Sequence, residues 1–222
     1  MKMKYLNKLL FQTIVGNMIF RKKNYQVKDT NAVRRLCLDS NSIDEYFWTA
    51  SQKGNNNRMW SINELMSTIA LIVNKFNIKT AVEFGTAQCR SSAALIFGGI
   101  EELHSVDIVK DEVVNHFKFL TEKYEINWNF YCEDSRLFKV PKSELLLIDS
   151  LHNGEHLSQE LENAKNSISK LILLHDTYTY GENGDSGSGL NSAIKNFTNR
   201  NQEWKTILEY QFNNGLTVLQ RE

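Results

Sequence analysis

From residue 79 onward, short apolar runs alternate with stretches of helical periodicity, and this alternation constrains the fold more than any other feature. Each run is too short for a helix: TAVEF (80–84), LHSVDI (103–108), WNFYC (128–132), ELLLID (144–149) and KLILLHD (170–176). Helices fit the gaps at about 90–99, 111–124 and 155–168. Strands that alternate with helices indicate βαβ units, in which helices cover both faces of a parallel sheet. We therefore predict an α/β fold with a doubly wound, mostly parallel sheet.

The end of the chain has a different pattern. Two strand-like runs, WKTILEYQF (204–212) and LTVLQ (216–220), are separated only by Asn213, Asn214 and Gly215. Asn-Gly between two such runs is typical of a β-hairpin, because both residues accept a positive φ. The sheet is therefore predicted to have seven strands and to end in an antiparallel pair.

Helical periodicity dominates the chain before the alternation begins. Residues 1–20 carry a broad apolar stripe, formed by Leu6, Leu9, Leu10, Ile14, Val15 and Met18. The capping box SINE (61–64) predicts a second helix, whose apolar face is Ile62, Leu65, Met66, Ile69, Val73 and Phe76. The polar stretch SQKGNNNR (51–58) lies between them. We predict a helical N-terminal extension over residues 1–60 and an α/β domain over residues 61–222.

The net charge of zero hides a basic N-terminus. Residues 1–35 contain nine Lys or Arg and a single acid, Asp29, for a balance of +8. Such a segment can bind anionic lipid or nucleic acid, but it is more often the solvated face of a helix that packs on its own domain or on a second subunit. We therefore expect no nucleic-acid partner, and a homo-oligomer formed through the N-terminal helices is a hypothesis.

Cysteine usage and hydropathy bear on where the chain works. No apolar run reaches the roughly 18 residues of a membrane span, and the N-terminus lacks a small-residue cleavage site typical of a signal peptide. The three cysteines, Cys37, Cys89 and Cys132, are odd in number and share no close spacing. Buried thiols in a reducing compartment explain them most simply, so we expect a cytoplasmic protein without a transmembrane segment.

Acidic residues lie at the ends of successive predicted strands: Glu83, Asp107, Asp134, Asp149 and, after His175, Asp176. In an open parallel sheet, ligands bind at the carboxyl ends of the strands. The turn after Glu83, in VEFGTAQCRSS (82–92), has Gly85 but carries Ala87 and Cys89 where a dinucleotide fingerprint has its second and third glycines. This rim is therefore predicted to bind a ligand without a pyrophosphate.

The spacing of the acids suggests which ligand. Asp107 lies 22 residues beyond Gly85, near the distance at which an acid meets ribose hydroxyls in nucleotide-binding βαβ units. The segment EDS, which ends in Asp134 and Ser135, could accept from an adenine amine. An adenosine without phosphate is found in S-adenosylmethionine.

The motifs VEFGTAQCRSSAAL, LHSVDI, CEDS, LLLIDSLHNGEHLSQEL and LILLHDT resemble, in order, those of class I S-adenosylmethionine-dependent methyltransferases. The resemblance covers about residues 60–222 and is closest to small O-methyltransferase-like proteins of sugar and natural-product modification. It implies a Rossmann-like fold and methyl transfer from S-adenosylmethionine to a hydroxyl of a small-molecule acceptor. The cofactor-binding residues that it implies are Glu83, Gly85, Thr86, Ser91, Asp107, Asp134 and Ser135.

The same resemblance implies the catalytic residues. In metal-dependent O-methyltransferases, acids after strands four and five bind Mg²⁺, and these positions match Asp149 and Asp176 here, with His175 as a further candidate ligand. The residue three after the first acid serves as general base, which is His152 in this chain. Thr177 stands where catechol-type enzymes have Asn, so whether Mg²⁺ takes part stays open.

Two alternatives come from other classes. A nicotinamide-dependent oxidoreductase would share the fold but needs the glycines that Ala87 and Cys89 replace. A non-catalytic cofactor-binding or scaffold protein that uses the basic N-terminus is also compatible with the sequence. The segment GENGDSGSG (181–189) is either a mobile loop or one that closes over the acceptor.

Overall fold

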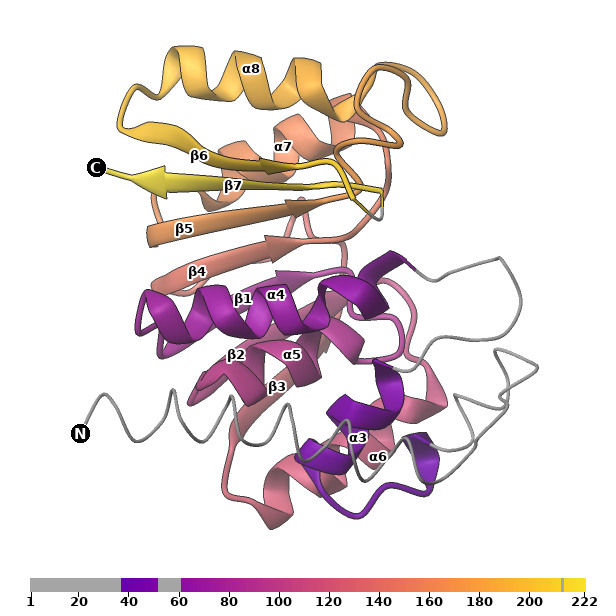
Figure 1. Cartoon of the computed structure of the whole chain (residues 1–222). Coiled ribbons are helices and arrows are strands. Elements are labelled where there is room, and N and C mark those ends of the chain that lie inside the picture. The colour runs from indigo at the N-terminus through magenta and orange to yellow at the C-terminus, as the bar shows by residue number, and fades with distance from the viewer. Residues whose placement is uncertain (1–36, 52–60, 213) are drawn as a thin grey trace.

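The structure, a computed structural model, describes residues 37–51, 61–212 and 214–222 (Figure 1). Its sheet has seven strands in the order β3-β2-β1-β4-β5-β7-β6. The strands are β1 Thr80–Phe84, β2 Glu102–Asp107, β3 Asn127–Cys132, β4 Ser143–Ile148, β5 Ile168–His175, β6 Trp204–Tyr210 and β7 Leu216–Arg221. Strands β1 to β5 pair in parallel, and β7 is antiparallel to both β5 and β6. The predicted sheet and its antiparallel C-terminal pair are confirmed.

Helices cover both faces of the sheet. On one face lie α4 Ser61–Lys75, α5 Arg90–Gly98 and α6 Glu112–Lys123, with α3 Ile43–Ala50 packed on α5 and α6. On the other face lie α7 Gly154–Ala164 and α8 Leu190–Arg200 (Figure 1). The helix predicted at 155–168 ends earlier, at Ala164, because β5 begins at Ile168. The helix α8 was not predicted.

The strand sequences explain this double cover. In β5, Leu171 and Leu173 belong to the core under α4 and α5, whereas Ile172 and Leu174 belong to the core under α7 and α8. Successive side chains of a strand point to opposite faces, so a strand that is covered on both sides must be apolar at every position. The continuous apolar run LILL therefore explains why helices cover β5 on both faces.

The helices α3 and α4 join this core. Every predicted apolar residue of α4 from Ile62 to Val73 is buried, and Phe76 is partly buried. In α3, Tyr46 and Phe47 are fully buried, and the Tyr46 hydroxyl donates to the carbonyl oxygen of Gln88 at 2.5 Å. The helix α3 therefore supports the turn that follows β1. The apolar stripe and basic charge of residues 1–35, and the hypothesis of assembly through them, lie outside the described residues.

Neither membrane spans nor disulfides occur in the described part of the chain. No described helix is long and apolar enough to cross a membrane. Cys37 and Cys89 are buried free thiols, and Cys132 is an exposed one. The prediction of buried thiols is therefore confirmed for Cys37 and Cys89 and wrong for Cys132, and the compartment stays a prediction.

Candidate active site

The turn between β1 and α5 begins the site. Gly85 has φ +84°, and a Cβ there would lie 2.0 Å from the carbonyl oxygen of Asp149, so the ends of β1 and β4 approach too closely for any side chain. Ala87 (φ 41°) and Cys89 (φ 55°) are also in the left-handed region. The turn thus keeps the backbone conformation that glycine favours without having glycine at these two positions.

Asp107, at the end of β2, holds this turn in place. Its Oδ2 accepts from the backbone amides of Thr86 (2.9 Å) and Ala87 (2.8 Å), and its Oδ1 accepts from the amide of Val109 (3.0 Å). A carboxylate has about four acceptor positions, so further donors can still be bound. Sequence reasoning gave Asp107 a role toward ribose and missed its contact with the turn.

Glu83 lies beneath the turn and is fully buried. Its Oε2 accepts from the hydroxyls of Ser92 and Ser105, each at 2.6 Å, whereas Oε1 has no hydrogen-bond partner among the described residues. Burial raises the pKa of Glu83 to about 7, against the lowering effect of Ser105, Ser91 and Ser92. The buried Thr86 hydroxyl likewise has no partner in the described chain. Two unsatisfied buried polar atoms under one turn are typical of a ligand site.

The loop after β3 contains the predicted adenine contacts. Asp134 accepts from the guanidinium of Arg136 through both carboxylate oxygens, and this ion pair lowers the pKa of Asp134 to about 2. Ser135 instead points inward and donates to Glu160 of α7 at 2.5 Å. The Asp134 side chain is partly exposed, whereas Ser135 is buried.

Two exposed apolar side chains accompany these acids. Ile108, directly after Asp107, is 73% exposed, and Leu137 of the Asp134 loop is 83% exposed. A single exposed Ile or Leu is common on protein surfaces, but these two follow strand-end acids and place apolar surface at the carboxyl rim. Their position after strand-end acids was visible in the sequence, but sequence reasoning missed them.

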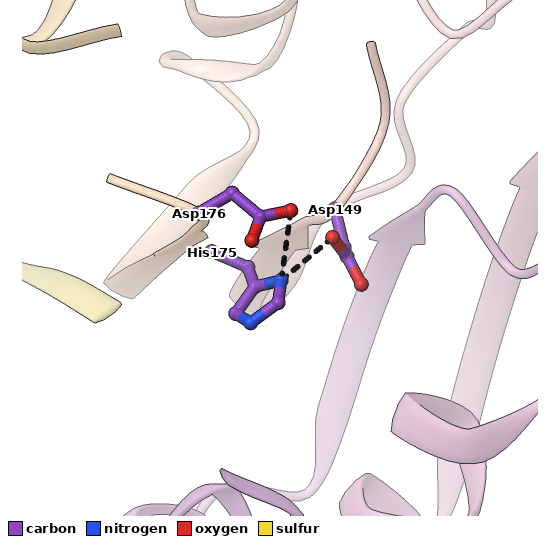
Figure 2. Close-up of side chains that lie close together, drawn as sticks. All are labelled: Asp149, His175 and Asp176. Atoms are coloured by element: carbon purple, nitrogen blue, oxygen red, sulfur yellow. Dashed lines mark hydrogen bonds and ion pairs between the residues drawn. The ribbon is translucent and has the colours of Figure 1, made fainter. Parts of the chain in front are cut away.

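Three predicted residues meet at the ends of β4 and β5 (Figure 2). The Nδ1 of His175 lies 2.8 Å from Oδ1 of Asp149 and 3.3 Å from Oδ2 of Asp176, and one ligand atom of each residue lies within 4.8 Å of the others. Burial disfavours a charge on His175, but the two carboxylates outweigh it and raise the pKa of His175. The buried Nε2 of His175 has no partner among the described residues.

Asp176 connects this trio to His152. The Nε2 of His152 lies 2.6 Å from Oδ2 of Asp176, and its Nδ1 lies 2.8 Å from Oδ2 of Asp185. Burial opposes protonation, but the bonds to Asp176 and Asp185 prevail and raise the pKa of His152. An imidazole can donate to two carboxylates only when it is protonated, so this arrangement favours the His152 cation over the free base.

The backbone at Asp176 is unusual. Its φ is 62°, a left-handed conformation that Asp tolerates better than most residues but that still costs energy. The two histidines bound to it lower the pKa of Asp176 far below its usual range, despite its burial. Thr177 is not part of this trio. Its hydroxyl instead accepts from the hydroxyl of Thr217, in β7, at 2.9 Å.

The loop 181–189 packs against the segment that carries His152. The amide of Asp185 donates to the carbonyl oxygen of His152, and the amide of Gly154 donates to that of Ser188, both at 2.8 Å. Asn153 also donates to the carbonyl oxygen of Ser186. Tyr180 stacks on the His152 ring with centroids 4.0 Å apart. The loop therefore covers His152, and nothing in its Gly- and Ser-rich sequence indicated that Asp185 would bind this histidine.

Known proteins were compared with this site and fold. No protein-family model and no curated protein matches the sequence. Among solved structures, the chain is similar to a methyltransferase from Podospora anserina bound to S-adenosylhomocysteine, with 14% identity and a TM-score of 0.57, over 86% of this chain and 94% of that one. At this identity the likeness concerns the fold.

Two further structures give the same result. The magnesium protoporphyrin IX methyltransferase from Synechocystis matches with 13% identity and a TM-score of 0.56, over 93% of this chain and 100% of that one. The N-methyltransferase NodS from Bradyrhizobium japonicum matches with 11% identity and a TM-score of 0.55, over 86% and 97% of the respective chains. This chain therefore has the fold of the class I S-adenosylmethionine-dependent methyltransferases.

Proposed function

We propose that this protein is an enzyme that transfers a methyl group from S-adenosylmethionine to a hydroxyl of a small molecule. The observation that carries the proposal is that the turn 83–87 lies against the end of β4. Asp149, directly after β4, belongs to the group of paired acids and histidines through its contact with His175. A turn with unsatisfied buried polar atoms therefore adjoins residues able to move a proton.

The cofactor half of the site would use the predicted residues. Asp107 has acceptor capacity left for the ribose hydroxyls, and Ile108 and Leu137 offer apolar surface to the adenine. Glu83 and Thr86 would supply free polar atoms toward the methionine end, with Gly85 shaping the turn and Ser91, in the first turn of α5, near the methionine carboxylate. An ammonium near Glu83 would favour its ionised form, which burial alone disfavours. Asp134 would accept from the adenine amine beside its bond to Arg136.

The acceptor half would use His152. Asp176 holds the Nε2–H of His152, so Nδ1 can take a proton once it is neutral and Asp185 has moved away. The acceptor oxygen then attacks the methyl carbon in line, the C–S bond breaks as the C–O bond forms, and the hydroxyl proton passes to Nδ1. Tyr180 stacks on the His152 ring and so limits the orientations of that ring.

A divalent metal fits the trio Asp149, His175 and Asp176. The Nδ1 of His175 faces two carboxylate oxygens, where a cation could replace the proton that they now share. Two carboxylates and an imidazole suit Mn²⁺, Fe²⁺ or Zn²⁺ at least as well as Mg²⁺, which prefers oxygen ligands. When bound, the metal would lower the pKa of an acceptor hydroxyl.

The two alternatives fare differently. Dinucleotide-binding sheets of oxidoreductases have the order 3-2-1-4-5-6, whereas here the antiparallel β7 is inserted between β5 and β6. This order argues against the oxidoreductase. The non-catalytic role is tested by the binding and methyl-transfer measurements described next.

The deciding experiment is calorimetric titration of the full chain with S-adenosylhomocysteine. We expect binding, and we expect Asp107→Ala to weaken it by roughly 1.5–3 kcal/mol, the scale of a charged hydrogen bond. Glu122→Ala is the control, since Glu122 of α6 is 66% exposed and faces Lys118 on its own helix. Absence of binding to the wild-type chain would reject the proposed function. Binding without methyl transfer from labelled S-adenosylmethionine to any acceptor of a broad panel would favour the non-catalytic role.

A further inference from the structure

A pocket of about 350 Å³ opens between α8 and the ends of three strands. Among its lining residues are Thr177 and Tyr178 after β5, Lys195 of α8, and Glu209 and Tyr210 of β6. Because β7 is antiparallel to both β5 and β6, the latter two run in the same direction. The end of β6 therefore lies on the same rim as the end of β5, where Asp176 directly precedes Thr177.

This pocket is distinct from the residues that would move the proton. None of Asp149, His152, His175 and Asp176 lines it. Its volume falls in the range of about 300–1,000 Å³ that holds small molecules in proteins. A ligand in this pocket would contact Thr177, the residue after Asp176, without contacting Asp176 itself.

The lining is polar and balanced in charge. Among the described residues that line the pocket, Lys195 is the only cation and Glu209 the only acid, so a strongly anionic ligand such as a nucleotide lacks counter-charges. Most of the remaining lining consists of hydroxyls and amides, namely Thr177, Thr198, Thr206, Thr217, Asn191 and Gln211. The Thr177 hydroxyl accepts from Thr217, so its own hydrogen is left to donate.

Two aromatic rings at this pocket are exposed to solvent. Tyr178 is 61% exposed and Tyr210 is 40% exposed. The backbone of Tyr178 is fixed, because its amide donates to the carbonyl oxygen of Asn214 at 2.7 Å and Gly215 packs against it. Exposed rings beside many hydroxyl-bonding groups suit a ligand with apolar C–H faces and hydroxyl edges.

We propose that this pocket binds a neutral polyhydroxylated ring, such as a glycosyl unit, of the methyl acceptor. The aromatic faces of Tyr178 and Tyr210 would pack against the C–H face of the ring, and the threonine hydroxyls and amides would bind its hydroxyls. A hydroxyl of the same acceptor that extends past Thr177 along the rim would then approach Asp176 and His152. The inference rests on the proposed function, and it names the substrate class.

The test is saturation-transfer NMR of the full chain, with and without S-adenosylhomocysteine. The probes are methyl glycosides of glucose, galactose, mannose and rhamnose, with catechol as a planar aromatic comparison. We expect saturable binding of at least one glycoside, weakened at least tenfold in the double variant Tyr178→Leu/Tyr210→Leu. Phe119→Leu, which removes a 58% exposed ring from α6, should leave it unchanged. Lys195→Gln should change it less than threefold, since the ligand is neutral.

The outcomes separate this inference from the proposed function. No saturable binding of any glycoside, or equal binding by the wild type and the double variant, overturns the pocket assignment even where S-adenosylhomocysteine binds. Preference for catechol, or a tenfold loss on Lys195→Gln, overturns the neutral polyhydroxylated ligand. Glycoside binding without affinity for S-adenosylhomocysteine would reject methyl transfer but retain the pocket. Thermal melts of each variant exclude unfolding as the cause.

Discussion

His152 lies between two carboxylates, with its Nε2 2.6 Å from Asp176 and its Nδ1 2.8 Å from Asp185. The two acids differ in their surroundings: the Asp176 side chain is 6% exposed and the Asp185 side chain is 48% exposed. Water therefore screens the bond to Asp185 far more than the bond to Asp176. The inner acid orients the ring, and the outer acid is the one that can be displaced.

The first prediction follows from this difference. Asp185→Asn removes one of the groups that raise the pKa of His152, so that pKa should fall toward its ordinary value. Since a base must be neutral, the acid limb of the methyl-transfer pH profile should move to lower pH. NMR titration of the His152 ring measures the pKa without an acceptor. Glu182→Gln, on the same loop, should leave it unaltered, and an unchanged His152 pKa in Asp185→Asn would contradict the described contact.

The same pair has a consequence for stability. The folded pKa of His152 is raised, so its contribution to the free energy of unfolding is complete below the unfolded pKa of about 6.5 and is lost as pH rises through the folded value. Asp185→Asn should therefore destabilise the chain below pH 6 and have little effect at pH 9. Urea denaturation at both pH values checks this sign.

Much of this fold could be predicted from local sequence, because strands buried on both faces must be apolar at every position. The helix α8 could have been predicted too, since Leu190, Ala193, Ile194 and Phe197 are its buried residues at helical spacing. The place of β7 between β5 and β6 depends on pairing between distant strands, which no local pattern encodes. The acids at the rim were found from their positions, but their partners were not.

Pairings across the site were missed for the same reason. The contact between His152 and Asp185 joins residues 33 apart through a loop of small polar residues, and nothing in that loop distinguishes Asp185 from a solvated acid. The bond of Asp107 to the turn at Thr86 depends on the register of β1 and β2, which fixes how close the two strand ends lie.

The next prediction concerns the left-handed residues of the turn. A non-glycine residue in this conformation costs about 1–2 kcal/mol, offset in part by the larger unfolded-state entropy of glycine. Ala87→Gly should therefore raise the free energy of unfolding by about 0.5–1 kcal/mol and the melting temperature by about 1–4 °C. Ala94→Gly, in the helical interior of α5, should do the opposite. A lower melting temperature for Ala87→Gly would contradict the φ of 41° at this residue.

Glu83 gives a prediction in which stability and binding move in opposite directions. Its folded pKa of about 7 exceeds the ordinary 4.5, so ionising it in the fold costs stability as pH rises between these values. Glu83→Gln avoids this loss and should raise the free energy of unfolding by on the order of 1–3 kcal/mol at pH 8, with a much smaller effect at pH 4.5. Its affinity for S-adenosylhomocysteine should fall, because the ligand ammonium loses a carboxylate.

Urea denaturation and calorimetry measure these two effects. Glu122→Gln, which changes a side chain that is 66% exposed, serves as the control and should alter neither quantity. A stability difference between Glu83→Gln and the wild type that is the same at both pH values would show that the buried carboxyl does not titrate in this range.

The last prediction concerns a metal at Asp149, His175 and Asp176. Two carboxylates this close to one imidazole repel each other unless a proton or a cation lies between them, so a divalent ion would compete with the proton on His175. Mn²⁺ or Mg²⁺ should raise the melting temperature of the wild type in a concentration-dependent way, and more at pH 8 than at pH 6. Asp149→Asn should abolish this shift while S-adenosylhomocysteine still binds.

Chelation and His152→Ala then distinguish a catalytic role of the metal from a catalytic role of the base. If both act, excess chelator abolishes methyl transfer, and His152→Ala lowers the rate by roughly 10²–10⁴-fold, the usual effect of a positioned general base. His116→Ala is the control, because His116 of α6 contacts the carbonyl oxygen of Ser40 and lies outside the paired acids. Full activity in chelator would remove the metal and leave the Asp176–His152 pair to take the proton. Full activity of His152→Ala would remove the base as well, and catalysis would then rest on the proximity of the methyl group and its acceptor.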